Sequence, residues 1–316
     1  MLWRMTARFT TITLAPALDR TVRLDSPLMT SDVCRVRDES VEAGGKGLNV
    51  AKMLARLGCP VAAGGLLGDA NCEPFERMLH DYGIENRFVR VHGETRRNLM
   101  LLGTDGVERK INFPAFPDLE FADYLLRQIA LLAVKRTDVV VISGSLPQRF
   151  PARAVADLMA ELHALGKDIV LDTSGEALTL AAEAGPVLVK PNRKEAAQLL
   201  GRALETDDDL RSACRELAKR HEAAILSDGA GGAWFARGTA LYRARPPAVK
   251  ALDTTAAGDM MLGAFCSRYF PDRILRPEAI ALAMAAGAAA VELHASQVPD
   301  PARVEELARA VAIERG

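Results

Sequence analysis

The sequence predicts an α/β protein with a doubly wound, mostly parallel sheet, helices on both of its faces and a small β-sheet lid. Three observations lead to this fold class. Short apolar runs alternate with amphipathic helical segments along the C-terminal two thirds, which is typical of parallel strands joined by crossover helices. A strand-rich stretch at about residues 86–113 interrupts this alternation. The chain has 316 residues, of which 49% are hydrophobic, and this suffices for a large core.

Apolar runs bounded by polar turns are predicted as the buried parallel strands of the sheet. Four such runs stand out: Val139–Ile142, Ile169–Leu171, Val187–Val189 and Ala223–Leu226. In an open parallel sheet, ligands bind at the carboxyl ends of the strands. We therefore expect functional residues to follow such runs directly.

Amphipathic helices are predicted where apolar residues recur at positions i, i+3, i+4 and i+7. One such pattern covers residues 155–162 and ends at Gly166, and another covers residues 75–82 and ends at Gly83. Glycine commonly ends a helix because it adopts the left-handed conformation at little cost. These helices are expected to cover the faces of the sheet.

Two extended stretches, at about residues 17–42 and 86–113, are expected to form the lid. Within the second stretch, Thr104-Asp105-Gly106 separates two strand-like runs and predicts a hairpin. A helix at about residues 47–57 lies between the two stretches. We expect a single α/β domain over residues 1–316 into which the lid is inserted. An antiparallel extension at the sheet edge is the alternative.

The overall composition argues against several classes of protein. Lys and Arg total 40 and Asp and Glu total 41, a net charge of −1, whereas dedicated nucleic-acid binders are usually basic. The longest apolar stretch, residues 279–291, is shorter than the roughly 18 residues of a membrane span. The five cysteines are scattered without a CxxC pair, which predicts reduced thiols in a cytoplasmic protein. Neither a nucleic-acid nor a membrane partner is expected.

The segment from Ala43 to Ala51, AGGKGLNVA, joins a glycine-rich turn to the start of a helix. Its glycines allow the backbone to approach a ligand closely, and a helix N-terminus favours anions or hydroxyl oxygens. Asn49, in the first turn, can donate and accept hydrogen bonds toward a polyol. The segment matches neither the Walker A loop nor GxGxxG. Considered alone, such a turn is equally often structural.

The segment Asp253–Phe265, DTTAAGDMMLGAF, predicts a second turn that leads into a helix near Gly258. Successive backbone N–H groups in such a turn can hold a phosphoryl group. Asp259 lies in the first turn of this helix, where a carboxylate is well placed to accept a hydroxyl proton. A helix-capping role is the alternative for Asp259.

Together, these two segments resemble the two signatures of the PfkB/ribokinase family of carbohydrate kinases. The resemblance covers nearly the whole chain. Four further segments carry it: residues 13–19 (TLAPALD), 95–98 (TRRN), 143–147 (SGSLP) and 190–195 (KPNRKE). It implies a ribokinase-like fold and the ATP-dependent phosphorylation of a sugar hydroxyl.

The resemblance implies a catalytic centre in the second segment. Asp259 would be the general base, and the turn of Ala256, Ala257 and Gly258 would form an anion hole for the transferred phosphoryl group. Such an arrangement suits phosphoryl transfer, which depends on positioning and charge stabilisation. Two residues depart from the family pattern, since Ala256 replaces a usual glycine and Met260 replaces a small polar residue. A positive φ at Ala256 would cost ~1–2 kcal/mol.

The resemblance also implies binding of ATP and Mg²⁺. Asn192 and Glu195 match the family's NxxE motif and would position Mg²⁺, with Asp172 as a further metal candidate. The other nucleotide-binding candidates are Lys190, Ser227, Gly229 and Gly232. Without the resemblance, Glu195 would be interpreted as a first-turn carboxylate stabilised by the helix dipole. A monovalent cation is a further candidate cofactor.

The resemblance implies a sugar-phosphate substrate. The hydroxyl groups of the sugar would be held by Asp19, Gly45, Asn49 and Ser145. Its phosphate would be bound by Arg96 and Lys46, because a forked guanidinium and a helix-terminal ammonium suit phosphate. An unphosphorylated sugar would leave these two cations without a role. The small β lid would also pair across subunits in a homodimer.

The motifs are most similar to the branch that converts fructose 1-phosphate to fructose 1,6-bisphosphate. Fructose 6-phosphate and tagatose 6-phosphate are the alternative substrates. Some family members that use fructose 6-phosphate carry a lid lysine near the position of Asp32, and Arg35 or Arg37 would have to replace it here. A catalytically weak sugar-phosphate sensor is an alternative of another class, suggested by Ala256 and Met260.

Overall fold

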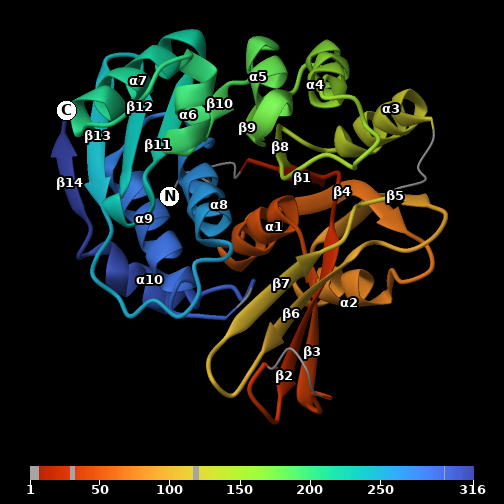
Figure 1. Cartoon of the computed structure of the whole chain (residues 1–316). Helices are drawn as coiled ribbons and strands as arrows, with labels where there is room; N and C mark the ends of the chain where they lie inside the picture. Colours follow the sequence, from red (N-terminus) through yellow and green to blue (C-terminus); the bar gives the residue numbers. More distant parts are fainter. Residues whose placement is uncertain (1–6, 29–32, 117–120, 295) are drawn as a thin grey trace.

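The computed structural model describes residues 7–28, 33–116, 121–294 and 296–316. In these residues, a ten-stranded sheet carries helices on both faces, and a four-stranded sheet projects from one end of it (Figure 1). The predicted fold class is therefore confirmed. The four-stranded sheet is called the lid below.

The large sheet is mostly parallel. Its strand order is β14 (Ala312–Arg315), β13 (Ala240–Arg245), β12 (Ala233–Arg237), β11 (Ala223–Ser227), β10 (Leu188–Val189), β9 (Asp168–Asp172), β8 (Val139–Ser143), β1 (Phe9–Thr13), β4 (Val61–Gly68) and β5 (Glu85–Val91). The strands from β11 to β5 in this order pair in parallel, whereas β12, β13 and β14 pair antiparallel. The sequence analysis did not predict this antiparallel edge.

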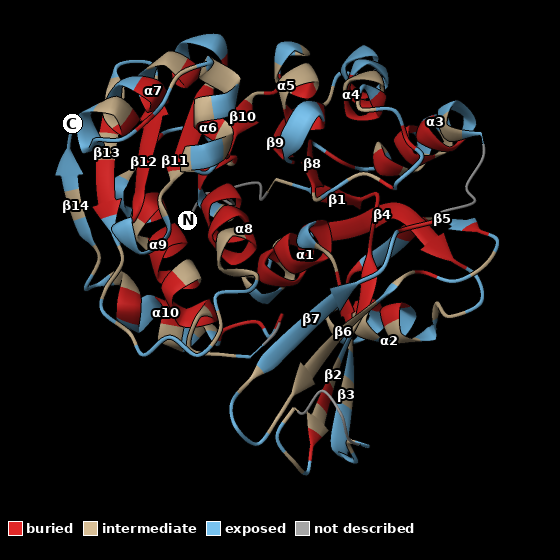
Figure 2. Cartoon of the chain, viewed as in Figure 1, coloured by how far each residue is buried: buried red, intermediate tan, exposed pale blue. Residues whose placement is uncertain are grey.

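The strands of the large sheet are apolar throughout because both faces of the sheet are covered. In β8, Val140 and Ile142 pack into the core on one face, and Val139 and Val141 pack into the core on the other. A strand buried on both sides gains nothing from alternating with polar residues, and this explains the continuous apolar runs of the sequence. Figure 2 shows this buried central layer.

Helices form one layer on each face of the large sheet. One face is covered by α3 (Ala122–Ala133), α4 (Ala154–Ala164), α5 (Gly175–Glu183), α6 (Arg193–Leu200) and α7 (Asp207–Arg220). The other face is covered by α1 (Lys46–Arg56), α2 (Glu73–Asp81), α8 (Ala257–Tyr269) and α9 (Pro277–Ala290), and α10 (Pro301–Ala308) packs on α9. Of the helices in the described residues, none has both the length and the hydropathy to cross a bilayer.

The lid has the strand order β3 (Val36–Gly44), β2 (Ala17–Leu24), β6 (Arg97–Leu102) and β7 (Glu108–Asn112). The central pair β2 and β6 is parallel, and the two outer pairs are antiparallel. The alternative of an antiparallel extension of the large sheet is wrong for these strands. Within the stretch 86–113, however, β5 belongs to the large sheet, because Phe88 and Val91 are buried in its two cores.

Candidate active site

A cavity of about 570 Å³ lies between the carboxyl ends of the parallel strands and one face of the lid. Its volume is within the usual range for small-molecule sites. Five neighbouring strands of the large sheet supply one wall: Thr13 ends β1, Gly144 and Ser145 follow β8, Asp172 ends β9, Lys190 follows β10 and Ser227 ends β11. The cavity is thus at the edge that the sequence predicted.

The lid supplies the opposite wall. Asp19 of β2 pairs in register with Asn98 of β6, and Asn98 pairs with Asn112 of β7. These three residues line the cavity, and Asn98 donates a hydrogen bond of 2.8 Å to Asp19. Burial raises the pKa of Asp19, although this hydrogen bond and the charge of Arg96 oppose the shift.

The glycine-rich turn allows the lid and helix α1 to meet at close range. A Cβ atom on Gly44 would lie 2.0 Å from a carboxylate oxygen of Asp19. Gly45 has a φ of 141° and is the N-cap of α1, and a Cβ atom there would lie 2.8 Å from the side chain of Thr13. Only glycine fits at these two positions without displacing a neighbour. The turn brings Lys46 and Asn49 to the cavity.

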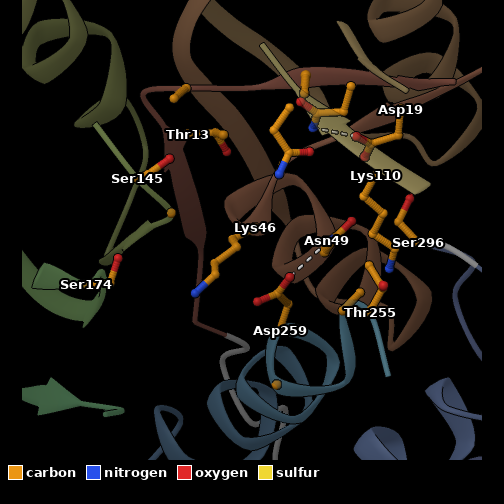
Figure 3. Close-up of a pocket in the computed structure, with 18 of the residues that line it drawn as sticks. Thr13, Asp19, Lys46, Asn49, Lys110, Ser145, Ser174, Thr255, Asp259 and Ser296 are labelled. Atoms are coloured by element: carbon orange, nitrogen blue, oxygen red, sulfur yellow. Dashed lines mark hydrogen bonds between the residues drawn. The ribbon is translucent and has the colours of Figure 1, made fainter. Parts of the chain in front are cut away.

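Asp259 of α8 lies at the bottom of the cavity, as Figure 3 shows, and only 6% of it is exposed. Its Oδ2 accepts a hydrogen bond of 2.9 Å from the side-chain amide of Asn49. Burial, followed by the nearby charge of Asp172, raises the pKa of Asp259 to about 6. The hydrogen bond from Asn49 and the charges of Lys190 and Lys46 limit this rise. A carboxylate with a raised pKa is a stronger base than an exposed one.

Ala256 is the N-cap of α8 and adopts the left-handed conformation, with φ 62° and ψ −3°. The sequence analysis identified a positive φ as the condition under which alanine is costly at this position, and the condition is met. The carbonyl of Ala256 accepts the amides of Asp259 and Met260. A helix start leaves its first amides without intrahelical acceptors, and here these belong to Ala257 and Gly258.

Lys190 and Asp172 form a buried ion pair beside the start of α8, with 3.1 Å between Nζ and the carboxylate. Ser143 also donates a hydrogen bond to Asp172. Burial alone would lower the pKa of Lys190, but the charges of Asp172 and Asp259 outweigh it and raise this pKa. A Cβ atom on Gly258 would lie 3.5 Å from Nζ of Lys190, so this ammonium faces the first turn of α8.

Asn192 and Glu195 form a reciprocal capping box at the start of α6. Asn192 Oδ1 accepts the amide of Glu195, and Glu195 Oε2 accepts the amide of Asn192. Both residues line the cavity, and Asn192 forms a β-bridge with Ser227. The helix-terminal role considered for Glu195 is therefore present in the structure. The bridge places the loop after β11 beside the capping box.

The side chains of Lys46, Arg96 and Lys110 add positive charge around the cavity. Arg96 donates to the carbonyl of Ala15 at 3.1 Å. Lys110, on β7, lies in the same row of the lid as Thr21 and Met100, which also line the cavity. Positive charge at these three positions favours an anionic ligand.

Several buried polar atoms around the cavity have no hydrogen-bond partner within the described residues. These atoms are Thr13 Oγ1, Asn49 Oδ1, Asn98 Oδ1 and Arg96 Nε. Leaving a buried polar group without a partner costs about 1–3 kcal/mol, so such groups indicate a missing ligand or water. These unpartnered oxygens and this nitrogen could bond to a ligand with several hydroxyl groups, because a hydroxyl group both donates and accepts hydrogen bonds.

Comparison with known proteins adds an independent observation. Residues 14–303 match the model of the family described as pfkB family carbohydrate kinase. The chain belongs to this family. A 1-phosphofructokinase of Rhodobacter capsulatus is 36% identical over 315 residues, covering 98% of both chains, and one of Vibrio cholerae is 36% identical over 267 residues, covering 83% of both.

Solved structures lead to the same family of pfkB kinases. Phosphofructokinase-2 from Escherichia coli, in complex with potassium, superposes with a TM-score of 0.87 at 28% identity, covering 96% of this chain and 99% of the other. The same enzyme in complex with fructose-6-phosphate has a TM-score of 0.85. The protein is therefore a sugar kinase, a phosphotransferase with an alcohol group as acceptor.

Most residues predicted from the pfkB signatures line the one cavity. Ala257, Gly229 and Gly232 lie outside its lining, as do Arg35 and Arg37, the two arginines considered as replacements for a lid lysine. Gly229 lines a neighbouring hollow together with Asn192 and Ser227. A Cβ atom on Gly232 would lie 2.2 Å from the carbonyl oxygen of Ala244, so this glycine serves a close approach to β13. Asp32 lies outside the described residues.

The sequence analysis missed several residues that line the cavity. They include Thr13, Asn98, Lys110, Ser174, Thr255 and Ser296. Thr13 and Asn98 belong to segments that carried the resemblance, so the sequence alone could have identified them as candidates. Lys110 needed the register of the lid strands, and Ser296 needed the tertiary fold.

Proposed function

We propose that this pfkB kinase transfers the γ-phosphoryl group of ATP to fructose 1-phosphate and produces fructose 1,6-bisphosphate. The buried Asp259, which faces the cavity beside the first amides of α8, is the observation that carries this proposal. The resemblance to 1-phosphofructokinases over 98% of the chain supports the choice of substrate. The cations around the cavity fit a substrate that already carries a phosphate.

Asp259 is the proposed general base. The hydroxyl oxygen of the sugar forms a bond to the γ-phosphorus, the bond from this phosphorus to the bridging oxygen of ATP breaks, and ADP leaves. The hydroxyl proton passes to the carboxylate of Asp259. The amide of Asn49 holds this carboxylate in one orientation through its 2.9 Å hydrogen bond. A carboxylate with a raised pKa accepts the proton more readily.

The first amides of α8 form the proposed anion hole. The N–H groups of Ala257 and Gly258 lie at the positive end of the helix dipole, where they stabilise charge on the transferred phosphoryl group. Lys190 adds a full positive charge near Gly258, held in place by Asp172. Ala256 is part of this turn because its left-handed backbone directs the chain into the helix.

The lid and the glycine turn bind the sugar phosphate in this proposal. Asp19 and the unpartnered oxygen of Asn98 accept hydrogen bonds from the sugar hydroxyls. Arg96 and Lys110 bind the phosphate that the sugar carries, and Lys46 balances charge beside Asp259. Ser145 lies on the opposite wall, in the loop after β8, and Gly45 provides close backbone access.

The nucleotide is proposed to lie along Asn192, Ser227 and Gly229, which line the neighbouring hollow. Mg²⁺ fits this region because the capping bond uses only Oε2 of Glu195, which leaves its second oxygen to a hydrated ion. The described residues contain no cluster of three or more potential metal ligands. Bound Mg²⁺ neutralises phosphate charge. Asp172 is not proposed as a ligand, because Lys190 and Ser143 occupy it.

Fructose 6-phosphate is the second candidate substrate. It is favoured by the match to phosphofructokinase-2, which has been solved with this sugar phosphate. A monovalent cation is proposed as a further cofactor on the same ground, since another structure of that enzyme contains potassium. Tagatose 6-phosphate is a further candidate, and the assay described next includes it.

An ADP-release assay with a panel of sugars tests the proposed substrate. The panel contains fructose 1-phosphate, fructose 6-phosphate, tagatose 6-phosphate and unphosphorylated fructose. The highest kcat/KM is expected with fructose 1-phosphate, and no more than trace activity with fructose. A higher value with either 6-phosphate would overturn the choice of substrate, and binding without turnover of any of them would indicate a sensor.

The lid is also the proposed homodimer interface. Its outer strands carry Val41 and Ile111, which do not line the cavity and are 48% and 44% exposed. Covering these two exposed apolar side chains would stabilise a dimer. Light scattering should give the mass of a dimer for the wild type and that of a monomer for Ile111→Lys. A monomeric wild type would contradict the interface.

A further inference from the structure

Lys52 is a charged side chain inside the core that the catalytic proposal leaves without a role. It lies on α1, one helical turn after Asn49, and is only 4% exposed. Its Nζ donates to the backbone carbonyl of Ser296 at 2.7 Å and to the hydroxyl of the same residue at 3.1 Å. An ammonium group buried to this degree requires compensation by strong hydrogen bonds.

Ser296 extends this contact to the lid. Its hydroxyl donates a hydrogen bond of 3.2 Å to Oε2 of Glu42 in strand β3. Glu42 pairs in register with Asp19 across the root of the lid, and Gly44 ends the same strand. Ser296 also lines the cavity, where Figure 3 labels it. A continuous hydrogen-bonded chain therefore connects α1, the segment after α9 and the root of the lid.

We propose that Lys52 is a positioning residue that fastens the root of the lid to the segment around Ser296. This contact holds Asp19 over Asp259, so that the sugar-binding strand and the catalytic helix keep a fixed separation. The inference deepens the proposed function, because its kinetic consequence concerns the sugar phosphate. Its structural consequence, which is the order of β3, does not depend on any substrate.

A role in stability alone does not explain the residue. Burial lowers the pKa of Lys52 to about 8, although the charges of Glu42, Asp19 and Asp259 oppose the shift. The protonated amine is thus less favourable in the folded chain than in water, and below about pH 8 the folded state bears this cost. Buried charges are often replaced by apolar residues without loss of stability. The free-energy cost of burying this ammonium group therefore agrees with a role of Lys52 in positioning the lid.

Lys52 is the cation that donates hydrogen bonds to Ser296. A small cavity beside it is lined by Glu42, Arg77, Asp81, Tyr82 and Ser296. Arg77 pairs with Glu73 of its own helix. Lys52 interacts electrostatically with three acids that lie on three separate elements: Glu42, Asp19 and Asp259.

Hydrogen exchange of Lys52→Met and Ser296→Ala tests the inference directly. Lys52→Met removes the donor while keeping much of the side-chain volume, and Ser296→Ala removes only the hydroxyl that reaches Glu42. Amides of β3 are expected to exchange about 10-fold faster in both variants, whereas those of β8 stay unchanged. Lys167→Met is the matched control, because Lys167 donates to the carbonyl of Thr137 at 2.8 Å, away from the lid.

Steady-state kinetics provides the second arm of the test. In Lys52→Met, the KM for the sugar phosphate should rise about 10-fold, while the KM for ATP and the kinetics of Lys167→Met stay within about 2-fold of the wild type. Unchanged exchange in β3 together with an unchanged KM for the sugar would overturn the inference. A wild type without kinase activity would refute the proposed function only, since exchange in β3 still decides on the role of Lys52. If Lys52→Met does not fold, hydrogen exchange of β3 in Ser296→Ala still tests the inference.

Discussion

The side-chain amide of Asn49 donates a 2.9 Å hydrogen bond to Asp259, a residue 210 positions away in the chain. This contact joins the first turn of α1 to the first turn of α8, so two helix N-termini converge on the same cavity. The amide group fixes the direction of the carboxylate and stabilises its charge. The two motifs found in the sequence therefore form a single site.

Replacing Asp259 by Asn should abolish phosphoryl transfer while leaving the fold intact. The amide of Asn has no basic oxygen of useful strength, so kcat should fall at least about 10³-fold. The affinity for the sugar phosphate and ATP should change by less than about 3-fold. Isothermal titration calorimetry and the ADP-release assay measure these quantities. Asp157→Asn, at an exposed position of α4, is the control.

The same variant should be more stable than the wild type. The folded-state pKa of Asp259 is raised from 3.8 to about 6, so the carboxyl contributes stability below pH 4 that is lost as the pH rises through 6. At pH 7, a neutral Asn should therefore raise the free energy of unfolding by about 3 kcal/mol. Urea denaturation at pH 7 and pH 4 measures this gain, which should shrink at the lower pH. A loss of stability at pH 7 would contradict the buried, ionised state of Asp259.

The pH dependence of turnover should report Asp259. The carboxyl must be ionised to accept a proton, so kcat/KM, which reports the pKa of the free enzyme, should fall about tenfold per pH unit below about pH 6. The hydrogen bond from Asn49 lowers this pKa, and Asn49→Ala should therefore move the acid limb to higher pH. An acid limb near pH 4 in the wild type would be inconsistent with a buried base.

The sequence predicted the layers of the fold well because local patterns determine them. The apolar run at β8 and the helical pattern at α4 needed no knowledge of the rest of the chain. The family signatures similarly placed Asp259 and Asn49 in one site. The hairpin of β12 and β13 turns at Gly238, a local signal that the sequence analysis did not use, whereas the pairing of β14 with β13 depends on which strands meet in the folded sheet.

Residues that act through tertiary contacts could not be found from the sequence. Lys110 lines the cavity because β7 pairs with β6 in one register, and a shift by one residue would turn its side chain away. From the sequence, Lys52 is a polar position of the amphipathic helix α1. In the structure it is buried and contacts Ser296, which lies in the C-terminal part of the chain. Neither side chain differs from an exposed lysine in its local sequence.

Ala256→Gly tests the backbone conformation at the start of α8. An alanine with φ 62° costs ~1–2 kcal/mol of folding free energy. Glycine removes this strain, but its greater conformational freedom in the unfolded chain offsets part of the gain. The free energy of unfolding should rise by about 0.5–1 kcal/mol, measured by urea denaturation. Arg136→Gly, at a φ of 48° in the exposed turn before β8, should give a similar gain. Only Ala256→Gly should also alter kcat, and a loss of stability would contradict the strained turn.

Arg96→Met and Lys110→Met test how the substrate phosphate is bound. Each side chain would make charge-assisted hydrogen bonds worth about 1.5–3 kcal/mol, so each loss should raise the KM for the sugar phosphate about 10- to 100-fold. The KM for ATP should stay within about 2-fold, because Arg96 and Lys110 lie on or beside the lid rather than near α6. Arg109→Met is the control for Lys110, because Arg109 is the neighbouring residue on the same strand and its side chain points to the other face of the lid.

The pattern of these effects across substrates identifies the phosphate position. If the lid cations bind the phosphate of fructose 1-phosphate, both variants should lose more kcat/KM with this substrate than with unphosphorylated fructose, for which the cations have no partner. An equal loss with both sugars would place Arg96 and Lys110 at the sugar ring instead. A selective rise in the KM for ATP would move them to the nucleotide, because the lid would then contact the donor rather than the acceptor.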